Sequence, residues 1–344
     1  MQRKPIHQQV VVVMGASSGI GRITALEFAR RGARVVASAR SEAGVTSLVE
    51  EIERRGGQAV AAPADVTRFE QVQHVAERAE QSYGRLDTWV HLAGVSLYAE
   101  LEQTTPEEFR QVIETNLVGA AYGAMAALPL LRHADDGGII FVSSVEAVRA
   151  LPFHAAYAAS KHGIKGMADA LRIELRHAKA NISVTNIMPA SINTPLFDHA
   201  RTKIGVKPKG MPPIYEPEQV AEAILTAAEY PERDVIVGGA GKALITGQML
   251  MPGLVDLYLR TFGFGGQRTR QPKATDAPDN LYAPIESETR VHGEPPNLET
   301  LEKLRRPAEA GNGLGMIMTS VALGAVAAAA TRMTQSRTKN RYSL

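Results

Sequence analysis

The sequence predicts an α/β fold: a doubly wound, parallel sheet of about seven strands with helices on both faces, followed by a helical extension. Short, continuously apolar runs rich in valine and isoleucine alternate with longer amphipathic stretches from residue 10 to about residue 240. This alternation is typical of strands that are buried on both faces and joined by helices. A glycine-rich segment also separates the first apolar run from the first amphipathic stretch. Right-handed crossovers between parallel strands then give the doubly wound arrangement.

The apolar runs set the expected strands. We expect strands over residues 10–14, 34–39, 58–62, 86–93, 138–144, 181–188 and 234–239. We expect residues 8–264 to form one domain. Its last part, residues 241–264, carries long apolar side chains at near-helical spacing, interrupted by Pro252. We expect a terminal helix that packs on the sheet, and the alternatives are a wall of an apolar substrate cleft or a face that touches a membrane.

Composition narrows the classes of function. The chain has 344 residues, 44% of them hydrophobic, and a net charge of +2, which argues against a nucleic-acid-binding surface. It has no cysteine, so disulfides, thiolate metal sites and a cysteine nucleophile are excluded and a reducing compartment is favoured. The nine histidines show no metal-ligand spacing, and we expect no metal site. The amino-terminal apolar run is too short for a signal peptide, so we expect a cytoplasmic catalytic body.

Beyond residue 264 the character of the chain changes. Residues 265–309 are polar and rich in proline, and they predict a flexible linker. Residues 310–331 form an apolar run of 22 residues without charge, and residues 332–344 form a basic tail. This combination leaves two alternatives open: attachment to a membrane surface through residues 310–344, or no membrane contact. A true span is disfavoured, because it would carry the basic tail across the membrane.

The glycine-rich segment "MGASSGIGR" lies where the first strand meets the first helix. Glycines there let the backbone approach a pyrophosphate, and the amino terminus of the helix supplies free N–H groups. At the end of the second strand, Ala39 stands where an aspartate would bind a ribose 2′-hydroxyl, and Arg40 follows. A guanidinium binds a 2′-phosphate that a carboxylate would repel, which favours NADP(H) over NAD(H).

A second motif is "HAAYAASKHG", where Tyr157 and Lys161 lie four residues apart and therefore on one face of a helix. Together with the glycine segment, this motif resembles the short-chain dehydrogenase/reductase family over residues 8–240. The family pattern T-G-x-x-x-G-[IL]-G is kept except that Met14 replaces the threonine. Ser144 precedes Tyr157 by 13 residues, and Asn116 stands in an N-x-x-G segment, as in the family.

The resemblance implies a Rossmann-type sheet and a set of cofactor-binding residues. His91 and Leu92 depart from the family's N-N-A-G segment, and Ala190 departs from its P-G-x-x-x-T segment. The cofactor-binding residues that the resemblance implies are Gly15, Ser17, Ser18, Gly19, Ile20, Gly21, Arg40, Asp65, Val66, Ala93, Gly94, Tyr157, Lys161, Pro189, Ile192 and Thr194.

The resemblance also implies catalytic roles for Asn116, Ser144, Tyr157 and Lys161. Tyr157 would be the acid/base, and we expect the Lys161 ammonium, together with the positive nicotinamide when it is oxidised, to lower its pKa. Ser144 would hold the substrate oxygen by hydrogen bonding, and Asn116 would support a water that links Lys161 to solvent. His154 and Phe153 lie beside Tyr157, where they line the pocket or serve packing.

These observations predict an NADP(H)-dependent oxidoreductase that interconverts a ketone or aldehyde and an alcohol. The apolar residues 241–264 and 310–331 suggest a lipid- or steroid-like substrate. Two alternatives stay open: an NADP-binding redox-sensing or scaffolding module without turnover, and an epimerase or dehydratase on the same fold. The resemblance alone implies a homo-oligomer, and no nucleic-acid partner is expected.

Overall fold

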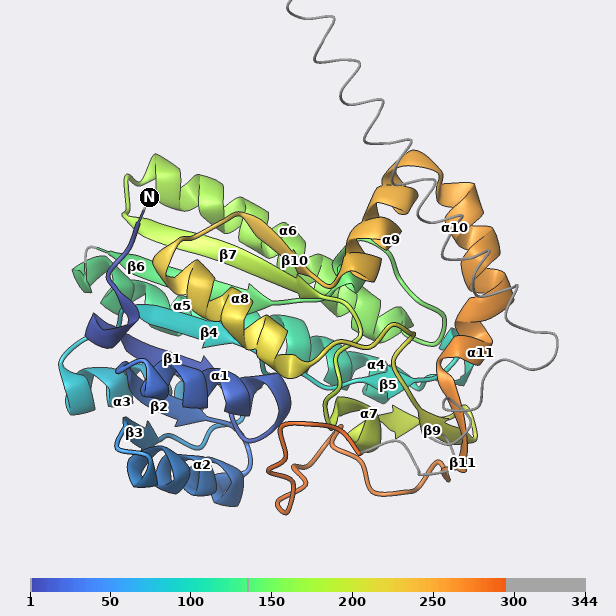
Figure 1. The fold of residues 1–344 in the computed structure, drawn as a ribbon, viewed down its shortest axis with the longest axis horizontal. Coiled ribbons are helices and arrows are strands. Elements are labelled where there is room, and N and C mark those ends of the chain that lie inside the picture. Colours follow the sequence, from blue (N-terminus) through green and yellow to red (C-terminus); the bar gives the residue numbers. More distant parts are fainter. Residues whose placement is uncertain (1, 135, 295–344) are drawn as a thin grey trace, which may run out of the picture.

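The computed structural model describes residues 2–134 and 136–294. Its centre is a seven-stranded sheet in the order β10-β7-β6-β4-β1-β2-β3, in which all neighbouring strands are parallel (Figure 1). The doubly wound sheet that the sequence predicts is confirmed. The strands are β1 Val10–Met14, β2 Arg34–Ser38, β3 Gln58–Ala61, β4 Thr88–His91, β6 Gly137–Val142, β7 Ile182–Pro189 and β10 Asp234–Val237.

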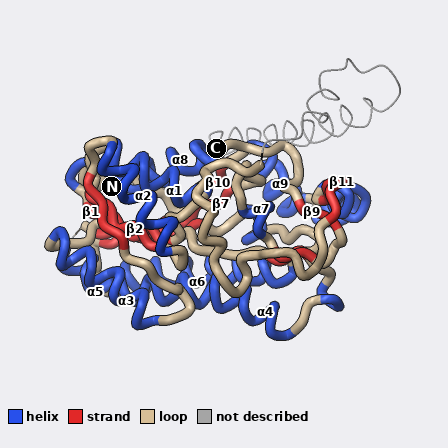
Figure 2. Tube along the Cα trace, turned by 90° about the horizontal axis from the view of Figure 1, so that it is seen from below, coloured by secondary structure: helices blue, strands red, loops and turns tan. Residues whose placement is uncertain are grey.

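Helices cover both faces of the sheet (Figure 2). On one face lie α1 Gly19–Arg30, α2 Glu42–Arg54 and α8 Pro217–Glu229. On the other lie α3 Phe69–Tyr83, α5 Gly119–Ala134 and α6 Ala155–His177, with α4 Pro106–Ile113 leading into α5 through one π-helical turn, Glu114–Val118.

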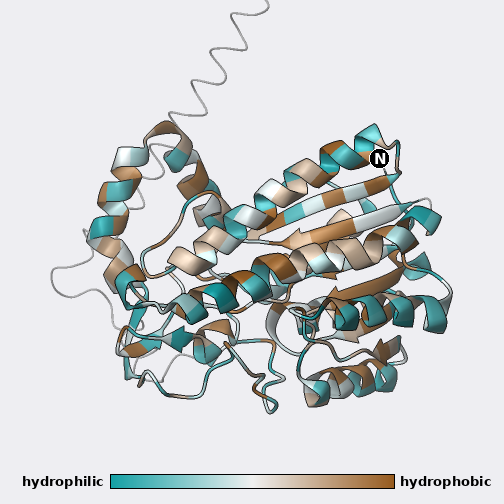
Figure 3. Ribbon diagram, turned by 180° about the vertical axis from the view of Figure 1, so that it is seen from behind, coloured by the Kyte–Doolittle hydropathy of each residue, from teal (hydrophilic) through white to brown (hydrophobic). Residues whose placement is uncertain are grey.

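Each strand is apolar on both sides because each side faces a layer of helices. Along β1, alternate residues enter the two cores: Val11 and Val13 pack with α1 and α8, whereas Val10 and Val12 pack with α3 and α5. All five residues of β1 are buried. Figure 3 shows the hydrophobic strands between helices of mixed character.

The order of the strands reverses at β1. This strand pairs with β2 on one side and with β4 on the other, so the crossovers leave it in opposite directions. In open α/β sheets, this reversal opens a crevice at the carboxyl ends of the strands, where ligands bind. The expected functional residues at the ends of β1, β2, β4, β6 and β7 therefore meet at one edge of the sheet.

The carboxyl-terminal helices α9 Gly239–Leu250 and α10 Pro252–Tyr258 form an arm beside the sheet (Figure 1). A π-helical turn, Leu259–Gly263, and the short helix α11 Phe264–Gly266 complete it. The expectation of a terminal helix packed on the sheet holds only for the start of this arm, where Gly241 and Ile245 are buried. Large apolar side chains farther along are exposed: Met249, Leu250, Leu254, Leu257, Phe262 and Phe264.

The flexible linker expected over residues 265–309 is wrong for the part that the structure describes. Strand β11, Arg268–Pro272, pairs antiparallel with β9, Val206–Pro208. Residues 273–294, which we call the C-terminal strap, then cross the body of the protein. Leu281 is fully buried, and Asp279 pairs with Arg201 at 2.8 Å. The polar composition predicted a linker, but polar groups of this segment form ion pairs and hydrogen bonds with the body of the protein. The remaining domain boundaries stay predictions.

No helix within residues 2–134 and 136–294 is long and apolar enough to cross a bilayer. The apolar run 310–331 and the basic tail 332–344 lie outside the described residues.

Candidate active site

The glycine segment forms a tight connection between β1 and α1. Gly15 has a positive φ of 88°, and a Cβ on it would lie 2.7 Å from the backbone nitrogen of Ala93. A Cβ on Gly21 would lie 2.0 Å from the carbonyl oxygen of Gly15. Neither position accepts a side chain, so the loop stays folded against the strand ends. The first residues of α1, Gly19, Ile20 and Gly21, line the cavity, and the amino terminus of a helix favours an anionic group.

A single cavity of about 270 Å³ runs from this loop along the carboxyl ends of the strands to Tyr157. Every residue that the sequence predicts for the site lines this cavity except Asp65 and Asn116. The Asp65 carboxylate instead accepts hydrogen bonds from the backbone N–H (2.9 Å) and hydroxyl (2.8 Å) of Thr67. It therefore shapes the turn into α3, while its neighbours Ala64 and Val66 line the cavity.

Asn116 lies fully buried in the π-helical turn. Its Oδ1 accepts from the N–H of Val95 at 2.8 Å, and its Nδ2 donates to the carbonyl of Val95 at 3.0 Å and to Ser160 Oγ at 3.1 Å. The side chain thus ties the segment after β4 to helix α6. Its contacts position the helix that carries Tyr157 and Lys161.

Ser144, Tyr157 and Lys161 converge at the far end of the cavity. Ser144 follows β6 and shares a hydrogen bond with Tyr157. One turn along α6, Lys161 Nζ lies 5.4 Å from the centre of the Tyr157 ring and donates to the carbonyl of Val142 at 3.1 Å. The spacing of four residues in the sequence therefore does bring the two side chains together.

The pKa values of these groups follow from burial and from Glu146. Burial raises the pKa of Tyr157 above its ordinary value, Glu146 raises it further, and the hydrogen bond with Ser144 opposes both. Burial lowers the pKa of Lys161 to about 8, against the attraction of Glu146. With the groups of the chain alone, the pKa of Tyr157 is therefore raised and not lowered as we expected. Burial disfavours both the phenolate of Tyr157 and the ammonium of Lys161.

Glu146 is a site residue that the sequence did not indicate. It lies in the short 3₁₀ turn after Ser144, and its Oε1 lies 2.7 Å from Nδ1 of His154. Both side chains are about 6% exposed. The only signal in the sequence was an acidic residue close to Ser144 and a histidine close to Tyr157, and nothing in the pattern paired them.

The C-terminal strap also lines the cavity, through Asn280, Pro284, Ile285 and Glu288. Arg40 Nη2 donates to the carbonyl of Asn280 at 2.6 Å. Ser41 Oγ donates to the Glu286 carboxylate at 2.6 Å. A polar, proline-rich segment carries no periodicity that predicts such contacts.

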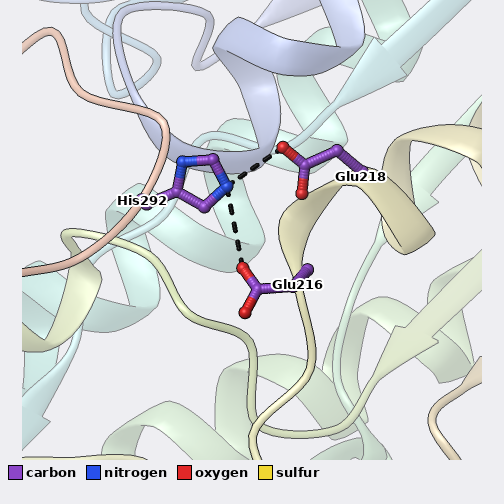
Figure 4. Close-up of side chains that lie close together, drawn as sticks. All are labelled: Glu216, Glu218 and His292. Atoms are coloured by element: carbon purple, nitrogen blue, oxygen red, sulfur yellow. Dashed lines mark ion pairs between the residues drawn. The ribbon is translucent and has the colours of Figure 1, made fainter. Parts of the chain in front are cut away.

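At the far end of the strap, His292 Nε2 lies 3.0 Å from Glu218 Oε1 and 3.6 Å from Glu216 Oε2 (Figure 4). All three side chains are exposed. When His292 is protonated, these ion pairs hold the strap against the start of α8. Among the described residues, this is the only group with metal-ligand proximity, and it shows no further sign of a ligand.

The motifs and their geometry agree with a comparison against known families. The sequence model of the family described as short chain dehydrogenase matches residues 9–205. The chain belongs to the short-chain dehydrogenase family.

Relatives of this short-chain dehydrogenase include an uncharacterized oxidoreductase, YxnA, of Bacillus subtilis. It is 36% identical over 286 residues, which cover 82% of this chain and 80% of the relative. The 3-oxoacyl-acyl-carrier-protein reductase FabG of Thermotoga maritima is 35% identical over 223 residues, 64% of this chain and 90% of the relative. The L-sorbose reductase of Gluconobacter frateurii, solved with NADPH and L-sorbose, shares the fold, with a TM-score of 0.60 and 24% identity over 67% of this chain and 95% of that one.

Membership makes this short-chain dehydrogenase an oxidoreductase that binds a nicotinamide cofactor and acts on CH–OH or C=O groups. The residues present fit such a cofactor: the glycine loop excludes side chains where a pyrophosphate would lie, and buried Oδ1 of Asn280 has no partner among the described residues beside the cavity.

Proposed function

We propose that this short-chain dehydrogenase interconverts a ketone or aldehyde and an alcohol with NADP(H), and that Tyr157 is its acid/base. The observation that carries the proposal is the convergence of Ser144, Tyr157 and Lys161 at one end of a cavity whose other end is the glycine loop. A bound nicotinamide would supply or accept the hydride. The chain has to hold the substrate oxygen and move one proton.

The side chains have distinct tasks in this reaction. Ser144 Oγ would hold the substrate oxygen beside the Tyr157 hydroxyl, with which it already shares a hydrogen bond. In reduction, Tyr157 donates its proton to the developing alkoxide, and in oxidation it accepts one from the alcohol. Because burial and Glu146 raise the pKa of Tyr157, the chain keeps the phenol protonated. A protonated phenol is the form that donates a proton when the carbonyl is reduced.

Replacing Tyr157 with phenylalanine tests this role. Proton transfer by a positioned side chain contributes on the order of 10²–10⁴ in rate, so kcat for carbonyl reduction should fall by that factor while NADPH binding persists. A panel of ketones, aldehydes and alcohols, followed by absorbance of the reduced cofactor, supplies the assay. Full activity of Tyr157→Phe on a confirmed substrate would refute the mechanism, and NADPH binding without turnover of any panel member would favour the redox-sensing or scaffolding alternative.

The preference for NADP(H) rests on the end of β2. Ala39 is buried without a carboxylate, and Arg40 lines the cavity with a half-buried guanidinium. One N–H of the Arg40 guanidinium donates to the carbonyl of Asn280, which leaves the other four to bind a phosphate. In the double variant Ala39→Asp/Arg40→Leu, the ratio of the NADPH and NADH dissociation constants should shift toward NADH. An unchanged ratio would refute the assignment.

Membrane attachment through residues 310–344 is a second part of the proposal. The basic tail and the apolar run support it, and so do the exposed apolar side chains of the arm, Met249, Leu250, Leu254, Leu257, Phe262 and Phe264. A catalytic body in the cytoplasm would then sit on the membrane, with access to lipid- or steroid-like substrates. Fractionation of cells that express the full chain or a chain ending at residue 309 tests it: both chains wholly in the soluble fraction would exclude attachment.

The homo-oligomer stays a prediction from family resemblance. Sedimentation of the purified chain would show whether it is a monomer, which would contradict the prediction.

A further inference from the structure

Beside Tyr157 lies a buried acid–histidine pair that the proposed reaction does not use. His154 is the residue that precedes helix α6, and its Nδ1 lies 2.7 Å from Oε1 of Glu146. The other carboxylate oxygen, Oε2, accepts from the N–H of Leu151 at 3.2 Å. The ring of Tyr98 packs edge-on against the imidazole, with 4.2 Å between the ring centres. These contacts fix both the orientation of the ring and its distance from Tyr157, 5.4 Å between centres.

The second nitrogen of this imidazole has no partner. His154 Nε2 is buried and forms no hydrogen bond among the described residues, and His154 lines the cavity. A carboxylate only accepts hydrogen bonds, so Nδ1 carries the proton that Glu146 binds. In the neutral ring Nε2 is then an acceptor. A buried acceptor without a partner is unfavourable, and here it belongs to a rigidly held side chain beside the reacting residue.

A second buried acceptor lies in the same wall. Gln267 is 1% exposed and lines the cavity, and its Nε2 donates to the carbonyls of Pro152 and Gly263, both at 3.0 Å. These two bonds fix the amide so that Oε1 is the free atom, and Oε1 has no partner among the residues that the structure describes. Because a primary amide donates only through its nitrogen, the two carbonyl partners exclude the flipped orientation.

These two fixed acceptors without partners belong to residues of the cavity wall, and a ligand that supplies hydrogen-bond donors there would satisfy them. A ketone or aldehyde oxygen only accepts, and it is already matched by Ser144 and Tyr157. A hydroxyl group donates to a neutral imidazole nitrogen or to an amide oxygen. The cavity lining also includes apolar residues such as Leu92, Val95 and Leu151, which offer a hydroxyl no partner.

We infer that His154, oriented by Glu146, and Gln267 form a hydroxyl-binding subsite, and that the substrate is therefore a hydroxylated carbonyl compound, or a diol in the oxidative direction. The inference rests on the proposed function, since it concerns the substrate of the same site. The substrate would then carry a hydroxyl group in addition to the apolar part that residues 241–264 suggest.

A pair of matched substrates tests the subsite. 1-Hydroxybutan-2-one and pentan-3-one have the same number of heavy atoms and differ by a hydroxyl in place of a methyl group. The wild-type chain should reduce the hydroxyketone with a kcat/KM at least about tenfold higher, because a site built for a hydroxyl discriminates strongly against a ligand without one. In His154→Phe the ratio of the kcat/KM values for the hydroxyketone and for pentan-3-one should fall by about tenfold or more, while the dissociation constant for NADPH stays unchanged. The control His162→Gln, on the exposed side of the same helix, should keep the wild-type preference.

The outcomes separate the inference from the proposed function. Equal kcat/KM values for the two ketones in the wild type would overturn the subsite and leave the proposed reaction intact, whereas no reduction of any carbonyl compound would overturn both. Equal losses on both ketones in His154→Phe would show a structural role instead. Should His154→Phe fail to fold, Gln267→Met removes the second acceptor at similar size, and an unchanged preference in that variant would overturn its part in the subsite.

Discussion

The backbone N–H of Gly19 donates a hydrogen bond of 2.9 Å to the carbonyl oxygen of Arg290. This bond joins the glycine loop at the start of the chain to the C-terminal strap near the end of the described residues. Together with the bond from Arg40 to Asn280, it makes the strap one wall of the cofactor cleft. Two groups that the sequence assigns to cofactor binding therefore have partners on the strap, and we expect residues of the strap to influence cofactor affinity.

Glu286 of the strap places a carboxylate on Ser41, next to Arg40. A negative charge there opposes a 2′-phosphate, so Glu286→Gln should tighten NADPH binding while the NADH dissociation constant stays unchanged. Because the side chain is exposed, the effect should be about two- to threefold and should disappear at high salt. Titration of intrinsic fluorescence at two salt concentrations measures it. Glu50→Gln, on the exposed face of α2, is the control. Equal tightening of both cofactors would contradict the explanation.

Lys161 should set the alkaline limit of carbonyl reduction. Its pKa is lowered to about 8, whereas that of Tyr157 is raised, so Tyr157 stays protonated while Lys161 loses its charge. As the pH rises through about 8, kcat/KM should fall, because the ammonium no longer stabilises the phenolate that forms. A pH–rate profile measures this limit. In Lys161→Arg the limit should move to higher pH, since a guanidinium keeps its charge, and an unmoved limit would assign it to another group.

Asn116 should contribute to stability as well as to the site. Asn116→Ala leaves the buried N–H of Val95 without its partner and removes two further hydrogen bonds. The free energy of unfolding should fall by about 3 kcal/mol, which urea denaturation followed by circular dichroism measures. Gln73→Ala, on the exposed side of α3, should change it by less than about 0.5 kcal/mol. A similar small change in Asn116→Ala would show that Asn116 does not tie α6 to the sheet.

His91 should make the fold sensitive to acid. The ring is buried with both nitrogens unpartnered among the described residues, and burial with the nearby Lys161 lowers its pKa to about 3. Between pH 6.5 and about 3, His91 is therefore protonated in the unfolded chain but neutral in the folded chain. Stability from this group is complete above pH 6.5 and declines as the pH falls, by roughly 2 kcal/mol at about pH 5.

The variant His91→Asn should remove that part of the pH dependence, and His177→Asn, on the exposed side of α6, should not. Urea denaturation at neutral and acidic pH compares the three chains. The same decline in the wild type and in His91→Asn would show that another group is responsible.

Periodicity was enough to predict the sheet, and spacing was enough to predict that Tyr157 and Lys161 lie together. Strands such as β1 are apolar at every position because helices cover both faces, and that requirement is local and visible in the sequence. The spacing between Tyr157 and Lys161 also has local meaning, since helix geometry places residues four apart on one face. Asp65 was assigned by resemblance, but its carboxylate accepts hydrogen bonds from Thr67, and Asp65 does not line the cavity.

By itself, the sequence determined the doubly wound sheet, the glycine loop and the place of Ser144, Tyr157 and Lys161. Only the tertiary structure paired Glu146 with His154, left Nε2 of His154 and Oε1 of Gln267 without partners, and laid the C-terminal strap across the cofactor cleft. The physical reason is the separation of the interacting residues along the sequence. Helix and strand patterns depend on residues that are close neighbours in the chain. Partners such as Gly19 and Arg290 meet only because the whole fold brings them together, and the desolvation that raises the pKa of Tyr157 depends on everything packed around it.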